Sequence, residues 1–383
     1  SRVSSLLDLR TPGGSNEVNA YTITISALDS TVTASQLNTI NDATSVAVIA
    51  NNVTNISASP ITDINTLLAA ASGGEISGLS NLTELIINDT GTVEANTINT
   101  IVTNADAING GGTTAVNIDT ATGVTGTEAH FDTLLTNEGN NLVTNLTDQA
   151  LFVTGGTIAV AKADTISATS TGVTTASITT TERVSALKTL SVTGASSDTA
   201  NAYTIVISSL DAAIADVADL NTIDTATSVA VDASEVTSMT GTASALNTLY
   251  TAASNGTVTG INAQETTILS DTASTSAAQV HTLKNTMDAL AAAQSPAVTP
   301  ANINAASVTS FSGVALDTLA VYSAGNTGRI TGLGAEDIII DESGSGGDGA
   351  LSVHDANLLD TYSTGVITAT IQENDSTTLA TLT

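Results

Sequence analysis

Apolar residues recur along this chain at helical spacing in several short stretches. Three of these stretches are Ala34, Leu37 and Ile40; Ile61, Ile64, Leu67 and Leu68; and Ala243, Leu246, Leu249 and Tyr250. An apolar residue at every third or fourth position places one face of a helix against a core. Thr33 and Thr242 directly precede two of the stretches and can cap free N–H groups, while Pro60 precedes the third and fits a first helical turn. The pattern therefore predicts short helices.

Short runs that favour β-strands lie between the helical stretches. They are residues 21–25 (YTITI), 45–48, 203–207 (YTIVI) and 337–340. In the first run Thr and Ile alternate, as a strand with one buried face requires. Glycines at residues 13–14, 110–112 and 346–347 supply turn signals along the chain.

The sequence contains a long internal duplication. Residues 2–68 and 183–250 are copies of each other, so that Arg2 matches Arg183, Tyr21 matches Tyr203 and Leu37 matches Leu220. We therefore predict two parts of the chain, residues 1–182 with the first long copy and residues 183–383 with the second copy and extra units at its C-terminal side.

A shorter period runs within each long copy. A signature of Asn or Asp, then Thr, then Leu or Ile begins at Asn38, Asn65, Asn99, Asp132, Asn221, Asn247 and Asp317. Periods of this kind are typical of solenoids, whose units bury their apolar sides against their neighbours. We predict an α/β solenoid in which short strands stack in parallel sheets, with short helices in each repeat of 26 to 36 residues. The alternative is an all-β right-handed β-helix, because units rich in Thr, Val and Ile suit that fold too.

The charge balance excludes one broad class of partner. Seven Lys and Arg residues stand against 37 Asp and Glu residues, and the formal net charge is −30. Nucleic-acid binding depends on many basic contacts to phosphates, so we expect no nucleic-acid partner. The chain has no Cys, and no run of 18 apolar residues that would predict a membrane-spanning segment. Aromatic residues make up only 2% of the chain, which indicates a thin core of aliphatic side chains.

Residues that could carry chemistry are scattered. His130, His281 and His354 lie in different repeats and are too widely spaced for a tetrahedral zinc site. The densest carboxylate groups are Asp337, Asp341 and Glu342, and Glu265 with Asp271. There is no Trp platform for a saccharide substrate, and the seven basic residues do not cluster. We therefore expect no enzymatic activity and no catalytic or cofactor-binding residue.

Calcium is the one candidate ligand. Residues 341–348 (DESGSGGD) form an acidic, glycine-rich segment, and hard oxygen donors in a flexible loop are what this ion prefers. The candidate metal ligands are Asp341, Glu342 and Asp348. The competing interpretation is a solvated loop at a break between repeats.

The wording of the repeats resembles that of very large cyanobacterial repeat proteins rich in Thr, Ala, Asp and Asn. The resemblance rests on ASALNTLYTAAS (243–254), ATSVAVDASEVTSMTGTA (226–243) and ITGLGAEDIII (330–340), and it extends over most of the chain. It implies secretion or display at the cell surface, with a structural or adhesive role. No catalytic residue is implied.

Two functions follow from these observations. In the first, the chain is a structural component of an extracellular filament, fibre or surface layer whose solenoid repeats associate end to end, so that its partner is the chain itself. In the second, it is the stalk of a cell-surface adhesin whose binding domain lies outside this fragment. The chain begins at Ser1 with a segment that matches the internal one at Arg183, and we expect a processed chain or a piece of a longer one.

Overall fold

Short helices alternate with short strands throughout the computed structural model, which describes residues 2–9, 19–194, 200–272, 274–341 and 350–383. By their internal contacts these residues form two units: unit 1 contains Ser1–Ser177 and Ser191–Tyr203, and unit 2 contains Ile178–Leu190 and Thr204–Thr383. The predicted boundary between the long sequence copies, at residues 182 and 183, stays a prediction. Each unit is described by itself.

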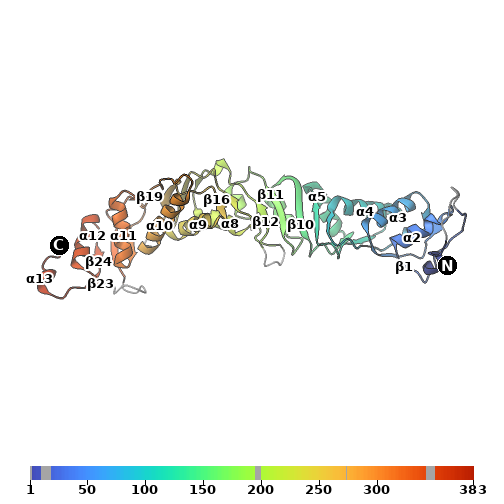
Figure 1. Ribbon diagram of the computed structural model, residues 1–383, viewed down its shortest axis with the longest axis horizontal. Helices are drawn as coiled ribbons and strands as arrows, with labels where there is room; N and C mark the ends of the chain where they lie inside the picture. The colour runs from blue at the N-terminus through green and yellow to red at the C-terminus, as the bar shows by residue number, and fades with distance from the viewer. Residues whose placement is uncertain (1, 10–18, 195–199, 273, 342–349) are drawn as a thin grey trace. The chain divides into compact units, whose positions relative to one another are not determined.

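In unit 1 helices follow one another along one side and strands pair beside them (Figure 1). Its helices are α1 (Val3–Leu6), α2 (Ala34–Asp42), α3 (Ile61–Ser72), η1 (Leu79–Asn81), α4 (Ala95–Ile108), α5 (Glu128–Gly139) and α6 (Val160–Ser167). Its strands are β1 (Thr31–Thr33), β2 (Val48–Ile49), β3 (Asn55–Ser59), β4 (Ile76–Ser77), β5 (Glu84–Ile87), β6 (Thr92–Glu94), β7 (Ala115–Asn117), β8 (Gly123–Gly126), β9 (Val143–Thr144), β10 (Ala150–Ile158), β11 (Thr174–Ile178) and β12 (Ala202–Thr204). They form three sheets in the orders β1-β3-β5-β7-β9, β2-β4 and β6-β8-β10-β11-β12.

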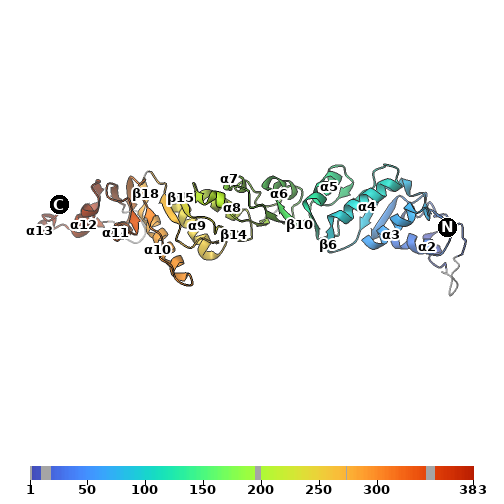
Figure 2. The ribbon, with the colours of Figure 1, turned by 90° about the horizontal axis from the view of Figure 1, so that it is seen from above.

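Unit 2 follows the same plan, and Figure 2 shows its helices from a second direction. Its helices are α7 (Val184–Leu187), η2 (Ser209–Asp211), α8 (Val217–Thr225), α9 (Ala243–Asn255), α10 (Ala277–Ala293), α11 (Ala315–Asn326), α12 (Val353–Tyr362) and α13 (Ser376–Leu379). Its strands are β13 (Ala213–Ile214), β14 (Val231–Asp232), β15 (Ser238–Gly241), β16 (Val258–Thr259), β17 (Thr266–Leu269), β18 (Ser274–Ser276), β19 (Ile303–Asn304), β20 (Ser310–Gly313), β21 (Ile330–Thr331), β22 (Asp337–Ile340), β23 (Ala350–Leu351), β24 (Ile367–Thr368) and β25 (Thr370–Ile371). The sheet orders are β13-β15-β17-β19-β21, β14-β16, β18-β20-β22-β24 and β23-β25.

The strands pair in parallel, and each sheet adds one strand per repeat. Val32 of β1 is opposite Ile56 of β3, and Met239 of β15 is opposite Thr267 of β17. Parallel neighbours need a crossover between them, and the helices supply it. We use the word coil for one such strand-and-helix repeat. The α/β class and the parallel sheets are confirmed, and the helices exclude the all-β alternative.

The internal duplication extends to the order of the sheets. The sheet β13-β15-β17-β19-β21 of unit 2 repeats β1-β3-β5-β7-β9 of unit 1, and β14-β16 repeats β2-β4. The sequence copies 2–68 and 183–250 continue into a further match of residues 76–91 with 258–273, and the equivalence of topology continues beyond both to β21 at Ile330–Thr331. The fold is thus repeated further than the clearest sequence copy.

Local capping explains where several helices begin. The Thr33 hydroxyl accepts a hydrogen bond from the N–H of Gln36, and the Gln36 side chain accepts one from the N–H of Thr33, so α2 starts with a capping box. Thr242 likewise accepts from the N–H of Ala245 at the start of α9. Both predicted capping residues are confirmed. The predicted strand at residues 21–25 forms only an isolated bridge from Thr24 to Ile49.

The core is thin and mainly aliphatic. Ile, Leu, Val and Ala side chains fill it, and the fully buried aromatic residues among those described are Phe131, Tyr203, Tyr250, Phe311 and Tyr322. Apolar residues of the signature point inward, as Ile40 and Leu249 do with 0% exposure. Each coil therefore buries its apolar side against the coils before and after it, where successive helices such as α2, α3 and α4 contact each other.

Glycines with a left-handed backbone conformation end some of the strands and helices. Gly260 follows β16 with a φ of 85°, and a Cβ on it would lie 2.3 Å from the backbone nitrogen of Ser234 in the preceding coil. Gly256 at the end of α9 has a similar φ of 79°, but nothing lies within 4 Å of its Cβ position. Gly256 and Gly260 therefore share the left-handed backbone conformation but differ in how closely the neighbouring coil packs on them.

We expect Gly260→Ala to lower the free energy of unfolding more than Gly256→Ala does. Both alanines adopt a left-handed conformation, which costs about 1–2 kcal/mol, but only the methyl group added at Gly260 also pushes neighbouring coils apart. Urea unfolding of the two variants beside the wild type measures the difference. Equal losses of stability would contradict close packing at Gly260.

Candidate functional site

The first residue of the signature lies on a helix and in several repeats reaches the next coil, and we call it the tie residue. Asn38, Asn99, Asn221 and Asn247 each donate a hydrogen bond from Nδ2 to a backbone carbonyl on the following helix. The acceptors are the carbonyls of Asp63, His130, Ala245 and Gln279, at 2.9, 3.0, 2.9 and 2.8 Å. In each case the acceptor belongs to the next helix and lies two positions before the tie position of that helix. The spacing is therefore the same at all these contacts.

The Thr of the signature bonds to its own helix. Its Oγ1 donates to the carbonyl four residues earlier, for example from Thr39 to Ser35 at 2.9 Å and from Thr100 to Asn96 at 2.8 Å. Thr66, Thr222 and Thr248 make the same contact. Such back-bonding satisfies the hydroxyl within the helix. The three parts of the signature thus have separate roles: contact to the next coil, local hydrogen bonding and core packing.

Tie residues other than Asn pair with side chains of the next coil. Asp132 on α5 pairs with Lys162 on α6. In unit 2 the Lys188 ammonium lies 3.0 Å from Asp219 of α8, and His281 Nδ1 of α10 lies 2.7 Å from Asp317 of α11. Lys188 and His281 occupy the tie position in KTL (188–190) and HTL (281–283). A search restricted to Asn and Asp missed both, although the Thr and Leu that follow each residue could have revealed them.

Carboxylates from the next coil cap the first N–H of several helices. The N–H of Ile61 at the start of α3 donates to Asp89 at 2.8 Å, and that of Ala243 at the start of α9 donates to Asp271 at 2.8 Å. The same contact joins Val3 to Asp29, Val184 to Asp211 and Val353 to Glu373, each at 2.9 Å. A carboxylate at this place satisfies a free N–H and interacts favourably with the helix dipole. Part of the acidic excess thus has a structural role.

An ion pair accompanies this cap at the start of both sequence copies. Arg2 contacts Asp29 at 3.2 Å in unit 1, and Arg183 contacts Asp211 at 3.1 Å in unit 2. In each pair the carboxylate also accepts the N–H of the following Val. Both arginines are about half exposed, so solvent screens these pairs and we assign them little stability.

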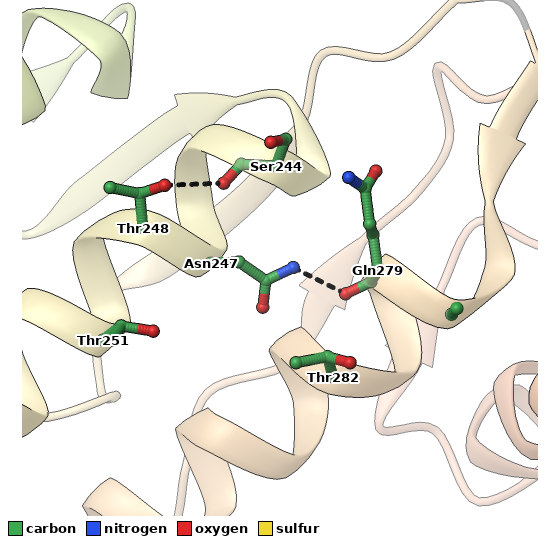
Figure 3. A pocket seen from close by; sticks show the side chains of 7 residues that line it. Ser244, Asn247, Thr248, Thr251, Gln279 and Thr282 are labelled. Carbon is green, nitrogen blue, oxygen red and sulfur yellow. Dashed lines mark hydrogen bonds between the residues drawn. The ribbon is translucent and has the colours of Figure 1, made fainter.

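A cavity of about 480 Å³ forms a groove between α9 and α10 (Figure 3). Asn247 and Thr248 of α9 face Gln279 and Thr282 of α10 across it, and the Asn247 amide bridges the floor to the Gln279 carbonyl at 2.8 Å. Hydroxyl, amide and small side chains line this groove, and none of its lining side chains is titratable. The groove is therefore a hydrogen-bonded contact between neighbouring coils.

The predicted calcium ligands fall largely outside the described residues. Asp341 directly follows β22, and its N–H donates to the carbonyl of Gly313 at 3.0 Å. Glu342 and Asp348 lie in 342–349, which is outside the described ranges. Calcium binding there stays a prediction. Among the residues that the structure describes, no group of three or more His, Asp or Glu side chains is placed to hold a metal ion.

The other candidate residues make contacts within the fold. Asp271 caps α9, and Asp337 accepts the N–H of Val366 at 2.8 Å. His130 forms a capping box with Thr127 at the start of α5. Glu265 is 5% exposed and accepts the N–H of Asn262 at 3.0 Å. Burial raises the pKa of the Glu265 carboxyl, and the backbone N–H of Asn262 partly opposes this shift.

No protein-family model, curated protein or solved structure matches this chain. Among the described helices, none combines the length and the apolar character needed to cross a lipid bilayer. The contacts between coils are therefore the structural features that bear on function.

We expect Asp271→Ala to lower the free energy of unfolding of unit 2 by about 1–2 kcal/mol, because the first N–H of α9 loses its cap. Hydrogen exchange at the Ala243 amide should speed up accordingly. Glu235→Ala, which removes an exposed acid of the same unit, serves as the control and should change neither quantity. An unchanged exchange rate at Ala243 in the Asp271 variant would contradict the capping role.

Glu265 predicts a pH dependence of stability. Because its pKa is raised in the folded protein, the folded state holds this proton more tightly than the unfolded chain does. Its contribution to stability therefore falls as the pH rises from about 4, the ordinary value for Glu, through the raised pKa. Glu265→Gln should lose less stability than the wild type between pH 4 and pH 7, as measured by urea unfolding. Parallel pH profiles would show that burial of Glu265 has no such effect.

Proposed function

We propose that this chain is a structural component of an extracellular filament, fibre or surface layer, built from α/β solenoid repeats that associate end to end. The observation that carries the proposal is a contact between coils that recurs along the chain: the coils of α2 and α9 donate a tie-residue amide to the next coil, and those of α3 and α9 donate the first helix N–H to a carboxylate of the next coil. Such a surface is complementary to another copy of itself in head-to-tail order, and heterologous contacts of this type generate open filaments.

Open sheet edges support self-association. The sheets have edge strands, among them β1 in unit 1 and β24 in unit 2. An unpaired edge is a template for another strand. A large apolar side chain, Val366, lies exposed at 67% next to β24. Both features are what a docking coil would cover.

An extracellular location agrees with the composition. The chain has a net charge of −30, and its repeats resemble those of secreted cyanobacterial proteins. At the ionic strength of seawater the screening length is only a few ångströms, so this charge opposes association less than it does at low salt. Self-association is therefore expected to strengthen with salt.

The test is sedimentation velocity of the chain over a range of concentrations in high salt, with and without calcium. We expect species larger than the monomer that grow with concentration. Val366→Asp should shift the distribution toward monomer, because it places a charge beside an edge strand.

Leu316→Asp is the matched control. Leu316 is 75% exposed on α11, away from the edge strands, so its substitution should leave association unchanged. A monomer at all concentrations would contradict end-to-end docking. It would instead favour the stalk of a cell-surface adhesin, in which the same repeats act as a spacer.

A further inference from the structure

One turn of the fold differs from its equivalents in unit 1 and unit 2. Four strands end in a related tetrapeptide: ISGL (76–79), VTNL (143–146), VTGI (258–261) and ITGL (330–333). The third residue of each has a positive φ, and the fourth is apolar. Leu79, Leu146 and Ile261 are 1, 1 and 4% exposed. Leu333 is only half-buried, so the apolar residue that is covered elsewhere is open here.

Leu333 is open because it faces a cavity of about 380 Å³. The cavity lies where the last turn of α11, the turn after β21 and the end of α12 meet within unit 2. Gly325 of α11 is opposite Leu333, and a Cβ on Gly325 would lie 2.7 Å from Leu333 Cδ1. The absence of a side chain at Gly325 therefore helps to keep the cavity open.

An aromatic ring that is held in place forms one wall. Tyr362 is half-buried and stacks on Tyr322, with ring centroids 6.3 Å apart and an angle of 6° between the rings. Tyr322 is fixed in turn, because its ring packs edge-on against Phe311 at 6.0 Å and its hydroxyl donates to Glu336 at 3.2 Å. In a chain with five Tyr, three Phe and no Trp, these three rings gather at one place. A preorganised ring costs little conformational entropy when a ligand packs on it.

The remaining lining is uncharged. Asn326 and Thr361 contribute an amide and a hydroxyl, and no acidic or basic side chain lines the cavity. Arg329 is close in sequence, but its guanidinium pairs with Asp288 at 3.0 Å. This lining suits a neutral ligand that has an apolar face and hydrogen-bonding groups. The volume is within the range of about 300–1,000 Å³ for small-molecule sites.

We propose that this cavity binds a neutral sugar ring of an oligosaccharide. The C–H face of the ring packs on Tyr362 and Leu333, and its hydroxyl groups bond to Asn326 and Thr361. Aromatic side chains with an adjacent polar rim suit this amphipathic shape. The site involves binding alone, and it goes beyond the proposed structural function.

The experiment titrates the whole chain with neutral oligosaccharides, namely cellotetraose, maltotetraose and chitotetraose, by saturation-transfer NMR and calorimetry. At least one should bind, and tetragalacturonate should not, because its carboxylates meet an acidic protein. Tyr362→Ala should weaken the binding about tenfold or more. Tyr21→Ala, at a Tyr that is 41% exposed in unit 1, is the control and should bind as the wild type does.

Gly325→Leu is a second variant that keeps the Tyr362 ring and fills the cavity. It lies inside α11, where leucine is a good helix former, so folding should be retained while binding is lost. The proposal is overturned if no neutral oligosaccharide binds the wild type, or if binding survives in both variants. Binding of phenol or indole without any sugar would also overturn it, because the site would then be a simple apolar one. None of these outcomes bears on end-to-end association.

Discussion

The structure depends on how the first N–H groups of its short helices are satisfied. Helix α2 illustrates this, because Thr33 accepts the N–H of Gln36 from within the same coil, whereas Ser59 of the next coil accepts the N–H of Ala34 at 2.9 Å. At α3 and α9 a carboxylate replaces the serine. A short helix gains little from propensity alone. Several coils are therefore completed by their successors, and this dependence gives the chain its direction.

The tie residues add a second constraint, and their chemistry divides them into two kinds. An Asn such as Asn38 or Asn247 donates to a backbone carbonyl, which every helix presents regardless of its sequence. Lys188 instead requires the carboxylate of Asp219 on the next coil. A tie residue that is Asn can therefore bond to any neighbouring helix, whereas a charged tie residue requires an oppositely charged side chain on the neighbouring coil. In a chain of similar repeats, such pairs favour the correct order over slipped pairings.

The sequence predicts what is determined locally and fails where contacts join distant residues. The helices at Ala34 and Ala243 and the caps Thr33 and Thr242 were predictable, because spacing and capping act within a few positions. The signature was visible too, but its role was not, because Asn99 and its acceptor His130 lie in different coils. Lys188 and His281 were missed since a different residue type stands at the tie position and pairs with a side chain of the next coil. The cavity at Tyr362 depends on the absent side chain of Gly325, which no sequence pattern indicates.

The matching pairs Arg2–Asp29 and Arg183–Asp211 have a consequence for how such a protein can change over generations. Equivalent contacts at equivalent places mean that a stretch of the gene spanning one long copy carries a set of coils with its own joining residues. Unequal crossing-over between such copies would insert or delete a whole set without leaving an uncapped helix in the middle of the chain. Length is then a trait that recombination can alter in large steps, while the interior of each coil is left as it was.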